Sequence, residues 1–291
     1  MTASPPHRSF ALVLSGGGAR GFAHMGVVSA LERWGYRPAA VVAVSMGALV
    51  GVTWACRSDW YRALLAMDTT PFPGPIQHGT GGKDSLAGRA RRAFRYVRVA
   101  EHMVRSWGPG APALEAGRSA LDGLVGSVRL EELDVPVVVC ATDLVSGDRI
   151  VLRSGRASEA IYASAALAGV LPPLVRDGWI LADGAYADVA PVDVARAMDV
   201  STVVAVDPGQ LMPHPEIGNG LQAVMRAMEI CHRKHADLRF EEADLVIRPR
   251  FRRSVDTLAF EAQRECIAAG FRGIRDVKRQ LQALLGPPHP R

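Results

Sequence analysis

The stretch Phe10-Ala-Leu-Val-Leu-Ser-Gly-Gly-Gly-Ala-Arg-Gly21 decides the fold, because an apolar run leads directly into a cluster of glycines. Its first five residues are all apolar, which is typical of a strand buried on both faces of a parallel sheet. The glycines permit a sharp turn and leave backbone N–H groups uncovered by side chains. Because Met25, Val28 and Leu31 then recur at helical spacing, the glycines precede a helix, where uncovered N–H groups bind anions.

A second junction between a strand and a helix carries a serine. The apolar run Ala40–Val44 ends at Ser45, and Met46-Gly47 and an apolar helical segment follow it. A serine on a tight turn between a strand and a helix, with small neighbours, is how a hydroxyl nucleophile is presented. An anion-binding loop and a nucleophile on neighbouring strand–helix units together predict acyl transfer.

Two other interpretations of the glycine run fail on neighbouring residues. The pattern G-x-G-x-x-G also marks dinucleotide sites, which need an acidic residue at the end of the second strand. No Asp or Glu lies between Arg33 and Asp59, so that residue is missing. A phosphate-binding loop needs Lys and Ser or Thr after Gly21, where Phe22-Ala23 stands. A glycine turn that only packs a helix onto a sheet stays open as the alternative.

A third apolar run, Trp179–Ala182, leads into Asp183-Gly184-Ala185. A carboxylate at the carboxyl edge of a parallel sheet points into the crevice where such folds hold their sites. We therefore expect Asp183 on the same edge as Ser45 and the glycine loop. Asp-Gly is also common in caps and turns, which is the structural alternative for Asp183.

In this order and spacing, the three motifs resemble the patatin-like phospholipase family. Further similar segments are Ala141-Thr142-Asp143-Leu144 with Gly147, Ala163-Ser164-Ala165, Gly169 to Pro173, Pro191-Val192-Asp193 and Val203 to Asp207. The resemblance covers residues 9–207 well and the C-terminal part loosely. It implies a three-layer α/β/α domain with a mainly parallel central sheet, an acyl lipid as substrate, and neither cofactor nor metal.

The resemblance implies a serine–aspartate dyad that works through an acyl-enzyme, with Ser45 as nucleophile and Asp183 as base. The expected oxyanion loop comprises Gly16, Gly17, Gly18, Ala19, Arg20 and Gly21, and the flanking motif residues are Ala43, Met46, Gly47, Gly184 and Ala185. A serine hydroxyl is a weak nucleophile until a neighbour accepts its proton. Each oxyanion donor typically stabilises the transition state by about 3 kcal/mol.

Two residues depart from the family pattern. Ala43 replaces the glycine two positions before the nucleophile, and Ala168 stands where the family often has proline. One added methyl is small enough for local rearrangement, so we expect Ala43→Gly to be tolerated. The departures keep open a catalytically weak lipid-binding or regulatory protein on the same scaffold. A thioesterase that acts on soluble acyl carriers is a further alternative.

The histidines do not suggest a triad. In α/β-hydrolases the histidine follows the acid, and the histidines after Asp183 are His214, His232, His235 and His289. The first and last lie near prolines, and the middle two lie in a basic helical run whose solvated face we expect them to occupy. His24 is expected to be a helix residue close to the glycine loop.

Length and composition predict a single domain over residues 8–285, with C-terminal helices over 221–285 and flexible ends at 1–7 and 286–291. The chain has 291 residues, of which 48% are hydrophobic and 22% charged, as in ordinary globular enzymes. Its four cysteines show no paired spacing, which predicts reduced thiols and no zinc site.

An insertion at residues 85–107 has the pattern of a basic amphipathic helix. Its polar faces include Arg91, Arg92, Arg95 and Arg98, which predicts peripheral contact with an anionic membrane. A surface helix with solvated arginines is the alternative, and no motif indicates nucleic acid. No secretory signal or membrane span is apparent, so we expect a cytoplasmic protein at or near the inner membrane surface.

Overall fold

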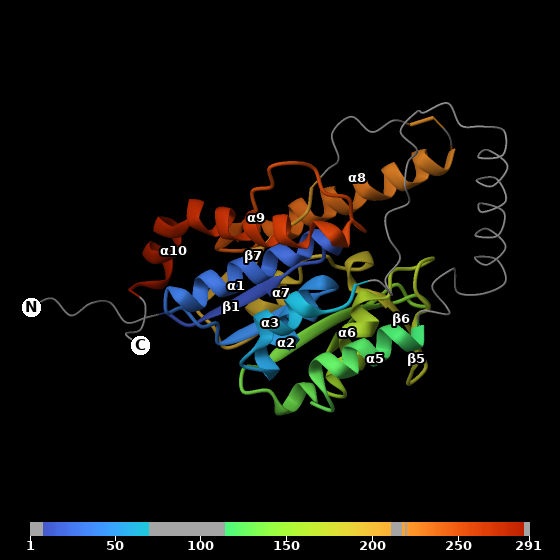
Figure 1. Cartoon of the computed structure of the whole chain (residues 1–291), viewed down its shortest axis with the longest axis horizontal. Helices are drawn as coiled ribbons and strands as arrows, with labels where there is room; N and C mark the ends of the chain where they lie inside the picture. Colours follow the sequence, from blue (N-terminus) through green and yellow to red (C-terminus); the bar gives the residue numbers. More distant parts are fainter. Residues whose placement is uncertain (1–7, 70–113, 211–216, 219, 288–291) are drawn as a thin grey trace, which may run out of the picture.

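The computed structural model describes residues 8–69, 114–210, 217–218 and 220–287, which form one mixed sheet with helices on both faces (Figure 1). The strands are β1 (Phe10–Leu14), β2 (Ala40–Val44), β3 (Val137–Asp143), β4 (Arg149–Leu152), β5 (Leu174–Arg176), β6 (Trp179–Asp183), β7 (Thr202–Val206) and β8 (Leu245–Ile247). The helices are α1 (Ala23–Arg33), α2 (Met46–Cys56), α3 (Trp60–Ala66), α5 (Leu114–Val125), α6 (Ala157–Ala165), α7 (Val192–Arg196), α8 (Gly220–Phe240), α9 (Gln263–Asp276) and α10 (Lys278–Leu285). Short 3-10 turns are η1 (Gly18–Phe22), η3 (Leu130–Glu132), η4 (Gly184–Tyr186) and η5 (Phe260–Ala262).

The sheet brings the predicted site loops to one edge. Its order is β5-β6-β3-β2-β1-β7-β8, and β4 pairs with β3 outside this path. β1 pairs in parallel with β2 and β7, and the β2–β3 and β7–β8 pairs are also parallel. Because carboxyl ends of parallel strands lie together, the glycine loop after β1 and the serine turn after β2 are neighbours.

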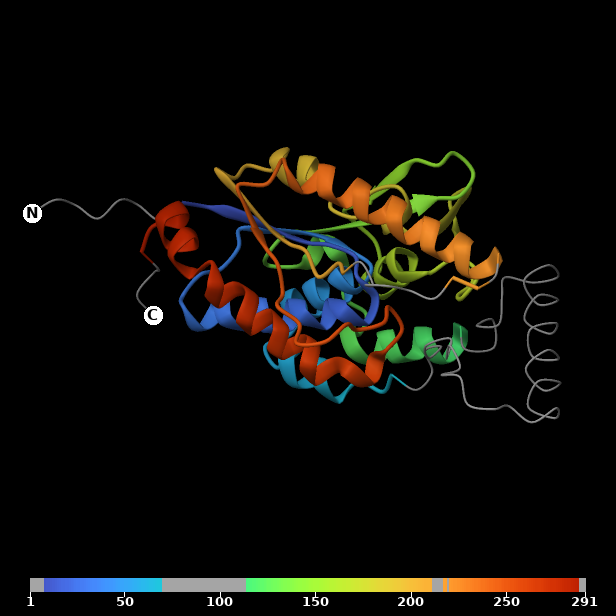
Figure 2. The same ribbon diagram turned by 90° about the horizontal axis from the view of Figure 1, so that it is seen from above.

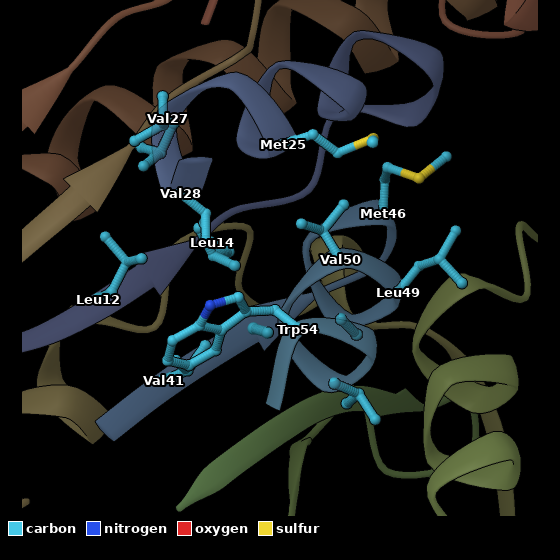
Figure 3. Packing of buried hydrophobic residues seen from close by; sticks show 14 of the residues in the cluster. Leu12, Leu14, Met25, Val27, Val28, Val41, Met46, Leu49, Val50 and Trp54 are labelled. Atoms are coloured by element: carbon cyan, nitrogen blue, oxygen red, sulfur yellow. The ribbon is translucent and has the colours of Figure 1, made fainter. Parts of the chain in front are cut away.

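Alternating side chains along the strands supply two hydrophobic layers. Leu12 and Leu14 of β1 belong to the larger cluster, whereas Ala11 and Val13 belong to a smaller one on the opposite face. Side chains of β1, α1 and α2 meet in the larger cluster (Figure 3). Seen from above, α8 lies on one side of the strands and α1, α5 and α9 on the other (Figure 2). The predicted three-layer α/β/α fold with a mainly parallel sheet is confirmed.

Two details differ from the expectations, and a third expected feature lies outside the described residues. β6, which ends at Asp183, runs antiparallel to β3, so the aspartate does not end a parallel strand. The C-terminal helices expected over 221–285 are α8, α9 and α10, but the strand β8 and the turn η5 lie between α8 and α9, and Val277 separates α9 from α10. The helix expected over 85–107 lies outside the described residues, as do residues 1–7 and 288–291 of the expected flexible ends.

Candidate active site

Two strands that meet end to end bring the serine and the aspartate together. β3 pairs with β4 over residues 139–142, with β2 over residues 137–140 and with β6 over residues 141–143. A strand has two edges, and residues of β3 that pair with β4 also pair with either β2 or β6. Both β2 and β6 therefore lie on the edge of β3 that is opposite β4. Their carboxyl ends therefore abut, with Val44 opposite Cys140 and Asp183 opposite Ala141.

The side chains at this meeting point are hydrogen-bonded. Ser45 Oγ donates to Oδ2 of Asp183 over 2.6 Å, and the two residues are only 7% and 6% exposed. Ser45 has φ 55° and ψ −123°, a backbone conformation that residues other than glycine rarely adopt. Strain of this kind is typical of a nucleophile turn, because the sharp bend holds the hydroxyl at the strand end.

The environment of Asp183 makes its carboxylate a stronger base than an ordinary aspartate. Burial raises the pKa of Asp183 to about 6, although hydrogen bonds from Ser45 and from the N–H of Ala185 lower it. Among the described residues, no basic side chain forms an ion pair with this carboxylate. Asp183 is therefore mostly ionised at pH 7 and can accept a proton from Ser45.

Two hydroxyl groups tie the serine and aspartate segments to their surroundings. Ser164 Oγ accepts from the N–H of Ser45 over 2.8 Å and donates to the carbonyl oxygen of Cys140 over 2.6 Å. Thr142 Oγ1 donates to the carbonyl oxygen of Asp183 over 2.8 Å. Sequence reasoning assigned no role to either hydroxyl, and the only available indication was their occurrence in the family-like segments 141–144 and 163–165.

The glycine loop packs against the serine turn and keeps two N–H groups unpaired. Gly18 has φ +55°, and a Cβ there would lie 2.3 Å from the carbonyl oxygen of Thr257, so only glycine fits. The N–H of Gly16 donates to Val189 and that of Ala19 donates to Thr257. No acceptor among the described residues bonds the N–H groups of Gly17 or Gly18. Of the six residues expected in the oxyanion loop, these two carry the N–H groups that can receive an anion.

Arg20 and Gly21, the last two residues of that loop, hold its shape. The buried Arg20 guanidinium donates to the carbonyl oxygens of Gly17 and Gln210 and to Oγ1 of Thr257. A Cβ on Gly21 would lie 2.5 Å from Met46, so the glycine loop and the serine turn are in direct contact. The arginine therefore braces the loop through its carbonyl oxygens.

Comparison with known proteins identifies the family of this chain. Residues 12–196 match the family described as patatin-like phospholipase. The chain belongs to the patatin-like phospholipase family. It is 33% identical over 203 residues to lysophospholipase NTE1 of Mycosarcoma maydis, covering 70% of this chain and 10% of that protein. It is 31% identical over 198 residues to an uncharacterized NTE family protein of Mycobacterium tuberculosis, covering 67% of this chain and 48% of that protein.

A solved structure shares the patatin-like fold at low sequence identity. VipD from Legionella pneumophila is 13% identical, with a TM-score of 0.51 over 95% of this chain and 68% of that chain. This likeness concerns the fold alone. The chain spans about a tenth to a half of the length of the curated relatives named above.

In this patatin-like fold, Ala43 of β2 faces Gly51 of α2. Ala43 is fully buried in β2, and a Cβ built on Gly51 of α2 would lie 3.6 Å from the Ala43 methyl group. Gly47 allows the first turn of α2 to pack closely against the end of β1, because a Cβ at this position would lie 2.1 Å from the carbonyl oxygen of Leu14. The methyl group of Ala43 therefore fills space in the larger cluster between β2 and α2.

We expect Ala43→Gly to keep ester turnover within about threefold of the parent while lowering the free energy of unfolding by about 1–2 kcal/mol. The loss combines one buried methyl, about 0.8 kcal/mol, with the backbone entropy of a glycine in a strand, about 0.5–1 kcal/mol. Urea unfolding and p-nitrophenyl ester turnover measure the two quantities. A gain in turnover above tenfold would show that the methyl group does displace the nucleophile.

The second departure from the family pattern, Ala168, takes part in a hydrogen bond that proline cannot make. Its N–H donates to the Tyr186 hydroxyl over 3.0 Å. Burial raises the pKa of Tyr186 to about 12, and the nearby Asp183 carboxylate adds to this effect. The Tyr186 ring also lies 5.7 Å from the ring of His232. This residue, which the sequence did not single out, links the segment before the aspartate to α8.

Neither His24 nor His232 forms a hydrogen bond with Ser45 or Asp183 among the described residues. His24 is fully buried, its Nε2 lies 2.9 Å from the carbonyl oxygen of Ser15, and burial lowers its pKa to about 4. Its Nδ1 has no hydrogen-bond partner among the described residues. His232 is half-buried against Tyr186 and not on the solvated face where it was expected, and burial lowers its pKa as well.

Some expected features cannot be placed. Arg91, Arg92, Arg95 and Arg98, the expected membrane contacts, lie outside the described residues. Within the described ranges, no cluster of His, Cys, Asp or Glu has the arrangement of a metal site. None of the helices described is both long and apolar enough to cross a membrane.

Proposed function

We propose that this chain hydrolyses carboxylic esters of lipids through an acyl-enzyme on Ser45. The observation that carries the proposal is the 2.6 Å hydrogen bond from Ser45 to the buried Asp183 carboxylate, beside a glycine loop with two unpaired N–H groups. A nucleophile, a base and anion-binding donors at one sheet edge are the components that acyl transfer requires. The family membership supports the same reaction class.

In the first half of the reaction, Asp183 accepts the hydroxyl proton of Ser45 while Oγ bonds to the ester carbonyl carbon. The carbonyl oxygen becomes an oxyanion, which the N–H groups of Gly17 and Gly18 receive. We assign the hole to these two because the N–H groups of Gly16 and Ala19 are already hydrogen-bonded. Two such donors typically lower the barrier by about 3 kcal/mol each. The ester C–O bond then breaks, and the leaving oxygen takes the proton from Asp183.

In the second half, water replaces the departed alcohol. Asp183 takes one proton from the water as its oxygen bonds to the acyl carbon, and the same oxyanion forms again. The bond between the acyl carbon and Ser45 Oγ breaks, and the serine recovers its proton from Asp183. The products are a carboxylic acid and the regenerated dyad, so the carboxylate serves first as base and then as acid in each half.

For the substrate class we propose acyl glycerophospholipids, with lysophospholipids first among them. Two of the relatives that this chain resembles at about one third identity are described as lysophospholipase NTE1. The test is a panel of a lysophospholipid, a diacyl phospholipid, a neutral ester and an acyl thioester, combined with labelling by a fluorophosphonate. Labelling with turnover of lipid esters supports the proposal. Turnover of the thioester alone would favour a thioesterase, and no labelling would favour a binding protein on the same scaffold.

We expect kcat/KM to show one acid limb near pH 6. The Asp183 carboxyl accepts a proton only when ionised, and burial raises its pKa to about 6. Activity is therefore full above this pH and falls about tenfold per unit below it. Hydrolysis of a soluble p-nitrophenyl ester between pH 4.5 and 9 measures the limb.

Histidine variants are the control for this limb, because an ordinary histidine titrates in the same range. His232→Gln and His235→Gln should each keep both the limb and most of the turnover. If either change removes the limb from a folded protein, a histidine is the base and the dyad is wrong.

A further inference from the structure

The main-chain N–H of the nucleophile has an unusual partner. Ser45 is the residue before the first turn of α2, where backbone N–H groups have no partner within the helix. Its N–H donates instead to the hydroxyl of Ser164 in α6, 119 positions away in the sequence. That hydroxyl in turn donates to the carbonyl oxygen of Cys140 in β3 over 2.6 Å. Ser164 is fully buried, so bulk solvent does not reach its hydroxyl.

We propose that Ser164 is a positioning residue for the reaction proposed above, holding the Ser45 turn in register with Asp183. Its hydroxyl fills the space between the turn and β3 and accepts one bond while donating the other. The inference rests on the proposed function, because it concerns the nucleophile of that reaction.

The backbone of Ser45 explains why such a support is needed. Its φ of 55° is a strained conformation for a serine, and a strained turn persists only where its surroundings over-determine it. Ser164 supplies one of these restraints from outside the β2–α2 segment. A second restraint acts on Asp183, because Thr142 Oγ1 donates a hydrogen bond to its carbonyl oxygen. Both hydroxyls are anchored at β3, so that strand sets the spacing between nucleophile and base.

The same bond also removes one N–H group from the candidate donors of the oxyanion hole. Because the N–H of Ser45 is directed at Ser164, it is not available to a substrate oxyanion. In the glycine loop, the N–H groups of Gly17 and Gly18 have no acceptor among the described residues. Ser164 therefore keeps the N–H of the nucleophile itself out of the hole, whose proposed donors lie in the glycine loop.

Loss of this hydroxyl should change the pH profile as well as the rate. Without Ser164 Oγ the buried N–H of Ser45 is unpaired, and the turn is free to relax away from Asp183. The hydrogen bond from Ser45 lowers the pKa of Asp183, so its weakening raises that pKa and moves the acid limb to higher pH. A residue that merely supports the fold would leave the limb in place.

The test compares Ser164→Ala and Ser164→Thr with Thr53→Val as a matched control. Thr53 is also a fully buried hydroxyl, in α2 itself, and it donates to the carbonyl oxygen of Leu49 without contacting the serine turn. We expect Ser164→Ala to lower kcat and the fluorophosphonate labelling rate together by about tenfold to a hundredfold, with KM little changed. Its acid limb should move up, and Ser164→Thr should recover most of the rate.

The control separates positioning from stability. Thr53→Val removes a comparable hydrogen bond, so it should lower the melting temperature but keep kcat and the limb of the parent. If Ser164→Ala keeps the kcat and the acid limb of the parent, Ser164 has no positioning role. The same holds if its kcat falls no more than that of a Thr53→Val protein with an equally lowered melting temperature, while the acid limb stays in place. That result leaves the proposed hydrolase intact, because labelling and turnover of the parent protein test the hydrolase separately.

Discussion

Replacement of Ser45 by alanine is expected to lower ester turnover by about 10⁴-fold or more, because loss of a nucleophile removes the acyl-enzyme route as a whole. The hydroxyl that is lost is the one that donates to Asp183. Its removal leaves the buried carboxylate with only the N–H of Ala185 as donor, which favours the protonated form. Hydrolysis of a p-nitrophenyl ester and labelling by a fluorophosphonate are the two measurements, and both should fall to background.

The fold should survive this change. Alanine and serine have similar difficulty with a φ of 55°, so the substitution adds little backbone strain. The N–H of residue 45 keeps its bond to Ser164. Ser58→Ala, at an exposed position just after α2, is the matched control and should retain labelling and turnover. Substantial turnover by a well-folded Ser45→Ala protein would refute the assignment of the nucleophile.

Replacement of Asp183 by asparagine is expected to abolish turnover and, at the same time, to stabilise the fold. Asparagine can keep both local hydrogen bonds, with Oδ1 accepting from the N–H of Ala185 and Nδ2 donating to Ser45 Oγ. In that arrangement the serine oxygen accepts a hydrogen bond and has no base for its proton. We expect turnover to fall by about 10³-fold or more.

The stabilising effect follows from the pKa of the buried carboxyl. Burial raises the pKa of Asp183 from 3.8 to about 6, so the folded protein holds a proton that the unfolded chain releases between these values. Stability contributed by the protonated group is present at low pH and is lost as pH rises through about 6. Above pH 6, the ionised Asp183 carboxylate lowers the free energy of unfolding by up to about 3 kcal/mol. The uncharged amide of asparagine avoids this cost.

Urea unfolding of the parent and of Asp183→Asn at pH 4 and pH 8 measures the contribution of the Asp183 carboxylate to the free energy of unfolding. We expect the variant to exceed the parent in free energy of unfolding by about 1–3 kcal/mol at pH 8, and by much less at pH 4. Asp177→Asn, at an exposed position beside β6, controls for a general effect of removing a negative charge. A variant less stable than the parent at pH 8 would show that the carboxylate supports the fold.

Local sequence was sufficient for the motifs whose conformations need particular residue types. Only glycine fits at position 18, which has a positive φ and lies against Thr257. Only glycine at position 47 lets the first turn of α2 pack closely against the end of β1. Such requirements leave a visible pattern, so the glycine loop and the serine turn could be placed between strands and helices in advance. The apolar runs of β1 and β2 likewise indicated a buried parallel sheet.

The direction of β6 could not be read in the same way. An apolar run that ends in a carboxylate looks alike in a parallel and an antiparallel strand, and the parallel assignment was wrong. The aspartate nevertheless reaches the serine, because β3 extends past the end of β2 and β6 pairs with that extension. The correct meeting point thus followed from an incorrect strand direction.

The sequence by itself therefore determined the order and local conformation of the motifs, and with them the fold class and the family. Only the tertiary structure decided that β2 and β6 abut on one edge of β3, that Ser164 holds the N–H of Ser45, and that burial raises the pKa of Asp183. The physical reason is range. Glycine conformations and apolar periodicity act over a few residues, whereas strand register, buried hydrogen bonds and desolvation depend on segments more than a hundred positions apart packing together.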